Sequence, residues 1–301
     1  MNPKIMIRGG FQQVQALVQQ LLIADLAVEC VVVPQTPEEA PGYQAIVTAS
    51  ALCRQLTVRI GTTADYRTAT WLVLVDADDP LPLPDQVTAL RRLTSQILES
   101  GFQGQMIFAG QHDAILTTFA WKFSGAALNK LWGLGTYPLN QLLTHRLAER
   151  LGVGVDMIQT TVVGQALAPV VAWSRTYVGP TPILMYLANA DAKFGADDLG
   201  KMASWLQRES QASQATLRRM ALIRLLARLL VQQAPIISVS HLQGDQPTLA
   251  MATPVLMTPQ GTQPITKLAL SEDEQRAYGE QVTALQTTMT QLEEHRMEGK
   301  G

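Results

Sequence analysis

The sequence is poor in charge, poor in cysteine and free of long hydrophobic runs. It has 23 Lys and Arg against 25 Asp and Glu, a formal net charge of −2. This balance excludes the basic surplus that concentrates nucleic acid or anionic lipid. No apolar run approaches the ~20 residues needed to cross a bilayer, and the first residues, MNPKIMIRGG, lack an apolar stretch of signal-peptide length. We therefore expect no nucleic-acid partner, no membrane partner and no secretion by that route.

Only two cysteines are present, Cys30 and Cys53, both in apolar surroundings. Two thiols in a chain of 301 residues indicate a reducing compartment rather than a disulfide framework, so we expect a cytoplasmic location. No Cys, His or Asp cluster has the spacing of a metal site. A Gly-x-Ser-x-Gly elbow and a Gly-Lys-Ser/Thr phosphate loop are also missing from the sequence.

What is present is enough apolar sequence for a large core, arranged first as alternating strands and helices. A short apolar run at 4–7, helical spacing at 14–22 and a β-branched run at 31–33 predict a βαβ unit. Further strands are expected at 56–60, 71–75 and 105–109, with a helix at 85–99 before the last. Alternation of this kind predicts a doubly wound parallel α/β sheet.

The order of predicted strands and helices changes in the second half of the sequence. Residues 114–124 and 139–151 read as helices, the second ending at Gly152, whereas 155–171 read as paired strands. A helical pattern over 197–233 precedes strands at 236–241 and 248–255, a turn near 260–263 and a final helix opened by a capping box at Ser271. We expect two domains, a parallel α/β domain at 1–112 and an α+β domain at 113–301.

Four arginines lie within the helical stretch 197–233, interleaved with an apolar stripe. They are Arg218, Arg219, Arg224 and Arg228. A basic amphipathic helix at a membrane surface is one interpretation. We favour the other, a helix whose apolar stripe packs on the sheet and whose arginines face solvent.

Three stretches of the sequence are informative when taken together: DAILTTFAWKFSG at 113–125, GLGT at 133–136 followed by LAERLGV at 147–153, and SGFQG at 100–104. In this order and spacing they resemble the NAD-dependent L-lactate/malate dehydrogenase family, and the likeness covers almost the whole chain. The resemblance implies an N-terminal Rossmann-like doubly wound sheet with a C-terminal α+β lactate/malate dehydrogenase-like domain. It also implies NAD as cofactor if the family's activity is retained.

The family's coenzyme positions carry unsuitable side chains in this sequence. Gly9 and Gly10 occupy the first βα turn, but Phe11 stands where the family has its second glycine. Pro34 replaces the aspartate that binds the ribose hydroxyls, and Gly110 replaces an asparagine beside the nicotinamide. Loss of a charged hydrogen bond costs about 1.5–3 kcal/mol. The resemblance therefore implies a degenerate coenzyme site, and we predict no cofactor.

The family's catalytic positions are also replaced. Ala166 stands at the position of the histidine that exchanges the proton, Leu139 at the aspartate that orients it, and Leu142 at the arginine that binds the substrate carboxylate. A positioned acid–base group contributes about 10²–10⁴-fold. The segment 75–85, at the place of the family's mobile loop, is shorter and has no arginine. We therefore predict no intact catalytic residue.

One pair of residues could form a different site. His112 and Asp113 follow a strand whose carboxyl end lies where open α/β sheets bind ligands. A repurposed base with the acidic segment 76–79 is one interpretation, and a turn histidine bonded locally is the one we favour. If the crevice has been altered to bind another ligand, we expect an open pocket with His112 pointing inward. A cleft filled by Phe11, Leu139 and Leu142 would contradict that hypothesis.

The favoured hypothesis is a dehydrogenase-like protein without NAD binding or hydride transfer that acts as a structural or regulatory partner. We expect a homo-oligomer, dimer or tetramer, or a hetero-oligomer with an active paralogue. A divergent oxidoreductase with another substrate or cofactor is the alternative. A third hypothesis is a working dehydrogenase whose catalytic residues align to the family in another register. It is the weakest, because no Glu-His-Gly-Asp string occurs in the sequence.

Overall fold

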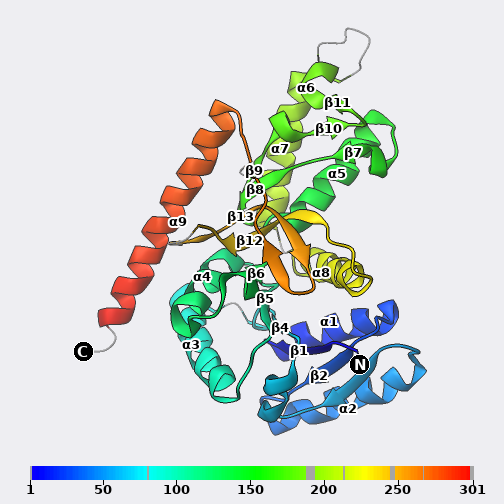
Figure 1. Ribbon diagram of the computed structural model, residues 1–301, viewed down its shortest axis with the longest axis vertical. Helices are drawn as coiled ribbons and strands as arrows, with labels where there is room; N and C mark the ends of the chain where they lie inside the picture. Colours follow the sequence, from blue (N-terminus) through cyan, green and yellow to red (C-terminus); the bar gives the residue numbers. More distant parts are fainter. Residues whose placement is uncertain are drawn as a thin grey trace.

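The structure is a computed structural model and describes residues 2–79, 81–187, 194–212, 214–244, 248–266 and 268–298. For residues 295–298 it describes the backbone alone. A parallel sheet forms the first half, in the order β3-β2-β1-β4-β5-β6 (Figure 1). Its strands are β1 (Lys4–Arg8), β2 (Glu29–Val32), β3 (Thr57–Ile60), β4 (Trp71–Leu74), β5 (Gln105–Phe108) and β6 (Leu131–Gly133). The strand order reverses between β1 and β4, which makes their carboxyl ends the switch point of the sheet.

Helices cover both faces of this sheet. On one face lie α1 (Phe11–Ala24), α2 (Ala40–Ala49) and α8 (Ala215–Leu230), and on the other α3 (Leu83–Glu99), α4 (Asp113–Ser124) and α9 (Glu272–Glu298). Successive strand residues alternate between the two cores, with Ile5 and Ile7 facing α1 and Met6 facing α3. The expected doubly wound α/β sheet is confirmed.

The sheet continues into the second half through antiparallel pairs. From β6 it runs through β12 (Ile236–Leu242), β13 (Ala250–Thr258), β8 (Val162–Gln165) and β9 (Ala168–Val171), with β14 (Gly261–Gln263) on β13. A small sheet joins β7 (Ile158–Gln159), β10 (Tyr177–Val178) and β11 (Thr181–Pro182). The helices here are α5 (Tyr137–Leu151), α6 (Ile183–Tyr186) and α7 (Ala196–Gln211). Short 3₁₀ turns lie at Pro37–Glu39, Ser50–Leu52, Thr63–Thr68, Leu128–Lys130, Val155–Met157 and Trp173–Arg175.

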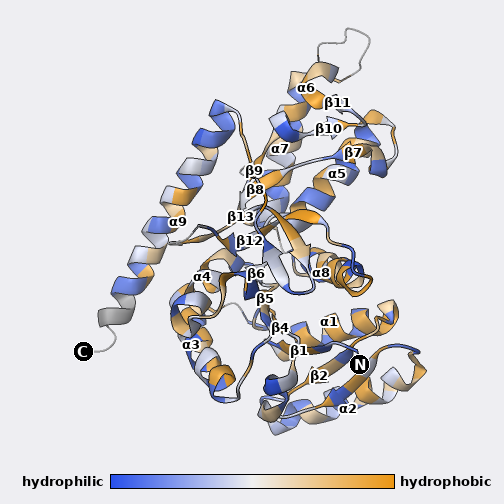
Figure 2. Ribbon diagram, in the orientation of Figure 1, coloured by the Kyte–Doolittle hydropathy of each residue, from blue (hydrophilic) through white to orange (hydrophobic). Residues whose placement is uncertain are grey.

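Two helix ends follow the expected local chemistry. Helix α5 ends at Gly152 with φ of +66°, a left-handed conformation that glycine adopts without steric cost. The Ser271 N–H donates to the Glu274 carboxylate at 3.0 Å, and the Glu274 N–H donates back to the Ser271 hydroxyl at 3.4 Å. The capping box is therefore confirmed. Figure 2 shows α9 as largely hydrophilic, and its buried residues Leu285, Met289 and Leu292 pack into the core beside α3.

Several expectations at the level of single elements are wrong. The sequence reading missed α2 and β6, and residues 261–263, expected as a turn, form β14. The helical stretch 197–233 is two helices, α7 and α8. Most importantly, Arg218 is not on a solvated face, because it is 2% exposed. No helix among the described residues is long and apolar enough to cross a membrane. The division at 112/113 stays a prediction.

Candidate functional site

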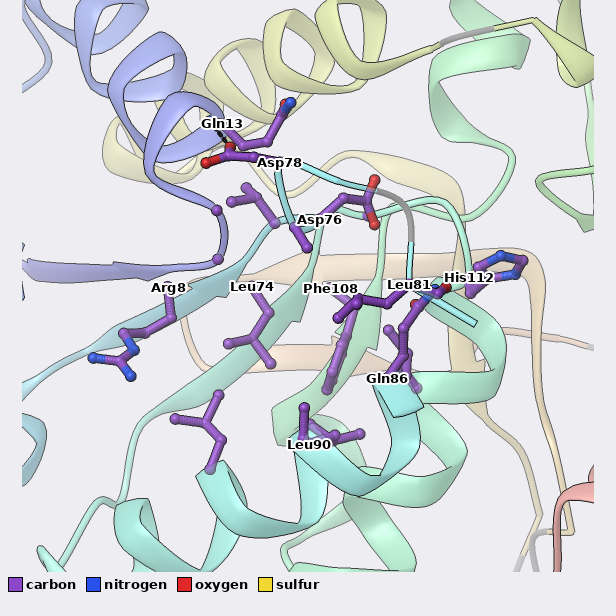
Figure 3. Close-up of a pocket in the computed structure, with 18 of the residues that line it drawn as sticks. Arg8, Gln13, Leu74, Asp76, Asp78, Leu81, Gln86, Leu90, Phe108 and His112 are labelled. Atoms are coloured by element: carbon purple, nitrogen blue, oxygen red, sulfur yellow. Dashed lines mark hydrogen bonds between the residues drawn. The ribbon is translucent and has the colours of Figure 1, made fainter. Parts of the chain in front are cut away.

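A cavity of about 1110 Å³ opens at the carboxyl ends of β1, β4 and β5, at the switch point of the sheet. Its mouth is formed by the loops after these strands, and one wall by α3 (Figure 3). Of the expected site residues, Gly9, Gly10, Gly110 and His112 line it. The cavity lies where the resemblance places the coenzyme, so the groups in its mouth decide what it can hold.

The two glycines of the first βα turn are in close contact with the loop after β4. A Cβ on Gly9, whose φ is +151°, would lie 2.5 Å from the carbonyl oxygen of Val75. A Cβ on Gly10 would lie 2.2 Å from the amide nitrogen of Asp78, and the Gly10 N–H donates to the Asp76 carbonyl at 2.9 Å. The absence of a side chain at both glycines therefore lets the loop after β4 approach the first βα turn closely.

Asp78 places its carboxylate at the start of α1. Its Oδ1 accepts hydrogen bonds from the Gln12 N–H at 2.9 Å and the Gln13 N–H at 3.2 Å (Figure 3). The first N–H groups of a helix have no partner within the helix and attract anions, including pyrophosphate in dinucleotide-binding folds. A side chain of the protein occupies this anion position.

The ends of the second and fifth strands are also closed by internal contacts. Pro34 is half-buried and does not line the cavity, but its neighbour Gln35 does, and the Gln35 side-chain amide donates to the Gly9 carbonyl at 2.6 Å. The Gln111 N–H donates to the Asp76 carboxylate at 3.2 Å, and a Cβ on Gly110 would lie 2.2 Å from the same carboxylate.

His112 lies at the rim of the cavity, at the opposite end of the lining from Arg8 (Figure 3). Burial lowers the pKa of its imidazole, against the opposing effect of the Asp76 and Asp113 charges. Among the described residues, its ring makes no hydrogen bond. A neutral imidazole can accept a proton, but no described group orients it.

Asp113 does not line the cavity and forms the centre of a buried polar cluster. Its side chain is 1% exposed and accepts from the Arg218 Nη2 at 2.6 Å and from the Ser240 hydroxyl at 3.2 Å. The Gly135 N–H also donates to it. Arg218 is likewise buried and donates through Nε to the Ala109 carbonyl at 2.9 Å. The cluster joins α4, β5, α8 and β12, so Asp113 holds the base of the site together.

The three positions of the family's catalytic groups lie away from the cavity. Leu139 is fully buried with Leu143 in the core around α5, and Leu142 is half-buried on the same helix. Ala166 is buried in the turn between β8 and β9. Leu139 therefore packs as helix core, whereas Leu142 is only partly covered.

Phe11 also lies outside the cavity lining, although the sequence placed it at the second glycine of the coenzyme turn. Its ring packs edge-on against Tyr43 of α2, with the ring centroids 5.1 Å apart. Phe11, Leu139 and Leu142 therefore do not fill the cleft, and the cavity is open.

Sequence reasoning named the acidic segment 76–79 and Arg218, but it predicted neither the contacts of Asp78 and Arg218 nor the role of Ser240. Arg218 had a readable signal, because it shares helical spacing with the buried residues Ala221 and Leu222 of α8. Asp78 had none, because its partners are 66 residues away in sequence. Within the described part of the chain, no group of three or more His, Cys, Asp or Glu residues could hold a metal ion.

The fold and the position of the cavity define a dinucleotide-binding type of α/β architecture with an antiparallel second half. No model of a known protein family matches the chain. An L-lactate dehydrogenase of Lactococcus lactis subsp. cremoris is 23% identical over 295 residues, which cover 92% of this chain and 91% of that protein. L-lactate dehydrogenase 3 of Bacillus cereus is 27% identical over 229 residues, covering 69% of this chain and 71% of that protein.

Solved structures agree with these sequence matches. The minor L-lactate dehydrogenase of Enterococcus mundtii superposes with a TM-score of 0.84 at 20% identity, covering 97% of each chain. The lactate dehydrogenase of Cryptosporidium parvum, solved with lactic acid and NAD, has a TM-score of 0.85 at 15% identity and covers 97% of this chain and 98% of that one. In sequence and fold the chain is similar to L-lactate dehydrogenases, which supports its resemblance to the L-lactate/malate dehydrogenase family.

The residues of this chain do not fit NAD, the cofactor of that Cryptosporidium structure. Asp78 occupies the helix N-terminus that would receive the pyrophosphate. Pro34 has no acceptor side chain for ribose hydroxyls. A dinucleotide phosphate at the start of α1 would have to displace the Asp78 carboxylate and break its hydrogen bonds to Gln12 and Gln13.

Proposed function

We propose that this protein keeps the dehydrogenase fold but neither binds NAD nor transfers hydride, and acts as a structural or regulatory partner. The observation that carries the proposal is the Asp78 carboxylate on the first N–H groups of α1. A dinucleotide phosphate placed there would lose these donors and meet a like charge. Charge-assisted hydrogen bonds contribute about 1.5–3 kcal/mol each, so displacement of Asp78 opposes binding strongly.

The chemistry of hydride transfer lacks its proton-transfer group as well. Ala166 cannot exchange a proton, and Leu142 cannot pair with a substrate carboxylate. His112, the candidate for a repurposed base, lies at the rim of the cavity without a hydrogen bond to its ring among the described residues. The buried ion pair of Asp113 and Arg218 supports a stable scaffold rather than a reaction centre.

Titration of NADH into the purified protein, followed by fluorescence and calorimetry, tests the proposal. We expect no saturable binding at millimolar NADH and no reduction of pyruvate or oxaloacetate above background. Saturable binding, or reduction of either substrate, would overturn it.

A matched pair of variants tests the role of Asp78. Asp78→Ala frees the N–H groups of Gln12 and Gln13, whereas Asp79→Ala removes the same charge one residue away. We expect ADP binding to increase at least tenfold more in Asp78→Ala than in Asp79→Ala. Equal effects would show that net charge, and not occupation of the helix end, governs anion binding.

We further propose that the protein works as a dimer or tetramer of its own chain, or in a mixed assembly with an active paralogue, in the cytoplasm. The similarity to L-lactate dehydrogenases supports the assembly. The free thiols Cys30 and Cys53 support the cytoplasmic location. Light scattering on the purified protein tests self-association. Co-purification of a tagged copy with the active paralogue tests mixed assembly, and a monomer that captures no paralogue would contradict both.

A further inference from the structure

The cavity extends from its mouth along the face of the sheet that α3 covers. Three residues form its floor, each the last residue of its strand. Arg8 of β1 pairs in register with Leu74 of β4, and Leu74 pairs in turn with Phe108 of β5. Residues in register on adjacent parallel strands point to the same face. Arg8, Leu74 and Phe108 therefore lie side by side, as Figure 3 shows.

The wall opposite this floor is formed by α3, and it carries an apolar strip beside exposed polar residues such as Gln96 and Glu99. Leu90 and Leu93 are three residues apart on α3 and so share one helix face, and Leu116 of α4 extends the same surface. All three line the cavity together with Leu74 and Phe108. An apolar body of a ligand placed here would be removed from water on both sides.

Arg8 is a positively charged side chain beside the apolar floor residues Leu74 and Phe108. Its side chain is half-buried and makes no hydrogen bond or ion pair among the described residues. By contrast, the buried Arg218 is paired with Asp113 at 2.6 Å. A guanidinium partly withdrawn from water and left unpaired is costly, and a carboxylate is its best bidentate partner.

The carboxylates of the cavity mouth do not supply that partner. Asp76 accepts from the Gln111 N–H, and Asp78 accepts from the N–H groups that open α1. Arg92, a second cation of the lining, is exposed at the rim. The charge of Arg8 is therefore available to a ligand.

We infer that this cavity binds an organic carboxylate with an apolar body, its carboxylate on Arg8 and its body between the floor residues Leu74 and Phe108 and the α3 residues Leu90 and Leu93. A volume of about 1110 Å³ exceeds what a small acid needs and accommodates a medium-chain acyl or aromatic acid. The inference rests on the proposed function in one respect: the cavity has to be free of dinucleotide.

Calorimetric titration of the full-length protein with octanoate, decanoate and dodecanoate, all below their micelle concentrations, tests the inference. We expect saturable binding whose affinity rises up to about fourfold for each added CH₂ group. Decanoate should bind at least tenfold more tightly than methyl decanoate or decylamine, because only the carboxylate pairs with a guanidinium. A preference for decylamine would overturn the inference, as would no saturable binding of any of the three acids.

Variants at two arginines locate the carboxylate. Arg8→Met keeps the length of the side chain and removes its charge, and we expect about tenfold or more weaker decanoate binding. Arg92→Met, the same change at the exposed rim, should leave the affinity within twofold. Equal losses in the two variants would overturn the assignment to Arg8. If Arg8→Met does not fold, as judged by circular dichroism, the head-group and chain-length comparisons in the unaltered protein decide the matter.

A parallel NADH titration without fatty acid separates this inference from the proposed function. Saturable NADH binding overturns the proposed function, whatever the result with decanoate. Failure of decanoate alone overturns the carboxylate site and leaves the absence of NAD binding in place.

Discussion

Removal of one partner from the buried Asp113–Arg218 pair should destabilise the protein severely. Among the described residues, Arg218 is the one cation paired with the Asp113 carboxylate, which is 1% exposed. Arg218→Met removes it and leaves that carboxylate with the Ser240 hydroxyl and the Gly135 N–H. An uncompensated buried charge costs about 3–5 kcal/mol. Asp113→Asn leaves the Arg218 guanidinium equally uncompensated, so we expect a loss of similar size.

Urea unfolding monitored by tryptophan fluorescence and circular dichroism gives the free energy of unfolding of each variant. The double variant Asp113→Asn with Arg218→Met should lose less than the sum of the two single losses, because neither charge is then left alone. The control is Arg276→Met, which breaks an ion pair whose side chains are 70% and 85% exposed. Exposed pairs contribute about 0–1 kcal/mol, so this loss should be small.

One result would refute this reasoning: an Arg218→Met variant whose unfolding free energy lies within about 1 kcal/mol of the unaltered protein. It would mean that the contact between Asp113 and Arg218 contributes little to the free energy of unfolding, so that the cluster is not a structural ion pair.

Three further predictions concern other groups. Burial lowers the pKa of His241 to about 4, so the unfolded chain binds the proton more tightly and stability should fall as pH decreases from about 6.5 to 4. His241→Gln should flatten that decline in urea midpoints, and an unchanged pH profile would contradict it. Gly10→Ala should lower stability, because the new Cβ would lie 2.2 Å from the Asp78 amide nitrogen, and a thermal midpoint at or above that of the unaltered protein would disprove the close approach. Burial raises the pKa of Cys30 to about 12, whereas Cys53 is partly exposed. Iodoacetamide should modify Cys53 first and Cys30 only on unfolding, as mass spectrometry would show, and early labelling of Cys30 would count against its burial.

Local sequence patterns predicted the elements whose conformation depends on nearby residues. The strands at β1, β4 and β5, the end of α5 at Gly152 and the capping box at Ser271 all follow from short-range spacing and side-chain chemistry. Strand β6 was missed because its three residues are too short to show a period. The resemblance also identified the family, since its three motifs keep their order along the chain.

The nature of the cavity depended on contacts between distant segments. Leu139, Leu142 and Ala166 showed from the sequence alone that the family's polar groups are replaced. Sequence could not show that the cleft stays open, because the direction of Phe11 depends on its packing against Tyr43.

The sequence by itself determined the order of most strands and helices, since hydrophobic periodicity is a local property. It also determined which of the family's polar side chains are replaced in this chain. Only the tertiary structure decided what replaced them. Asp78 reaches the start of α1 across 66 residues of sequence, and Arg218 reaches Asp113 across 105. A hydrogen bond between such distant residues has no periodic trace in the chain, because its geometry exists only once the sheet has brought the two segments together.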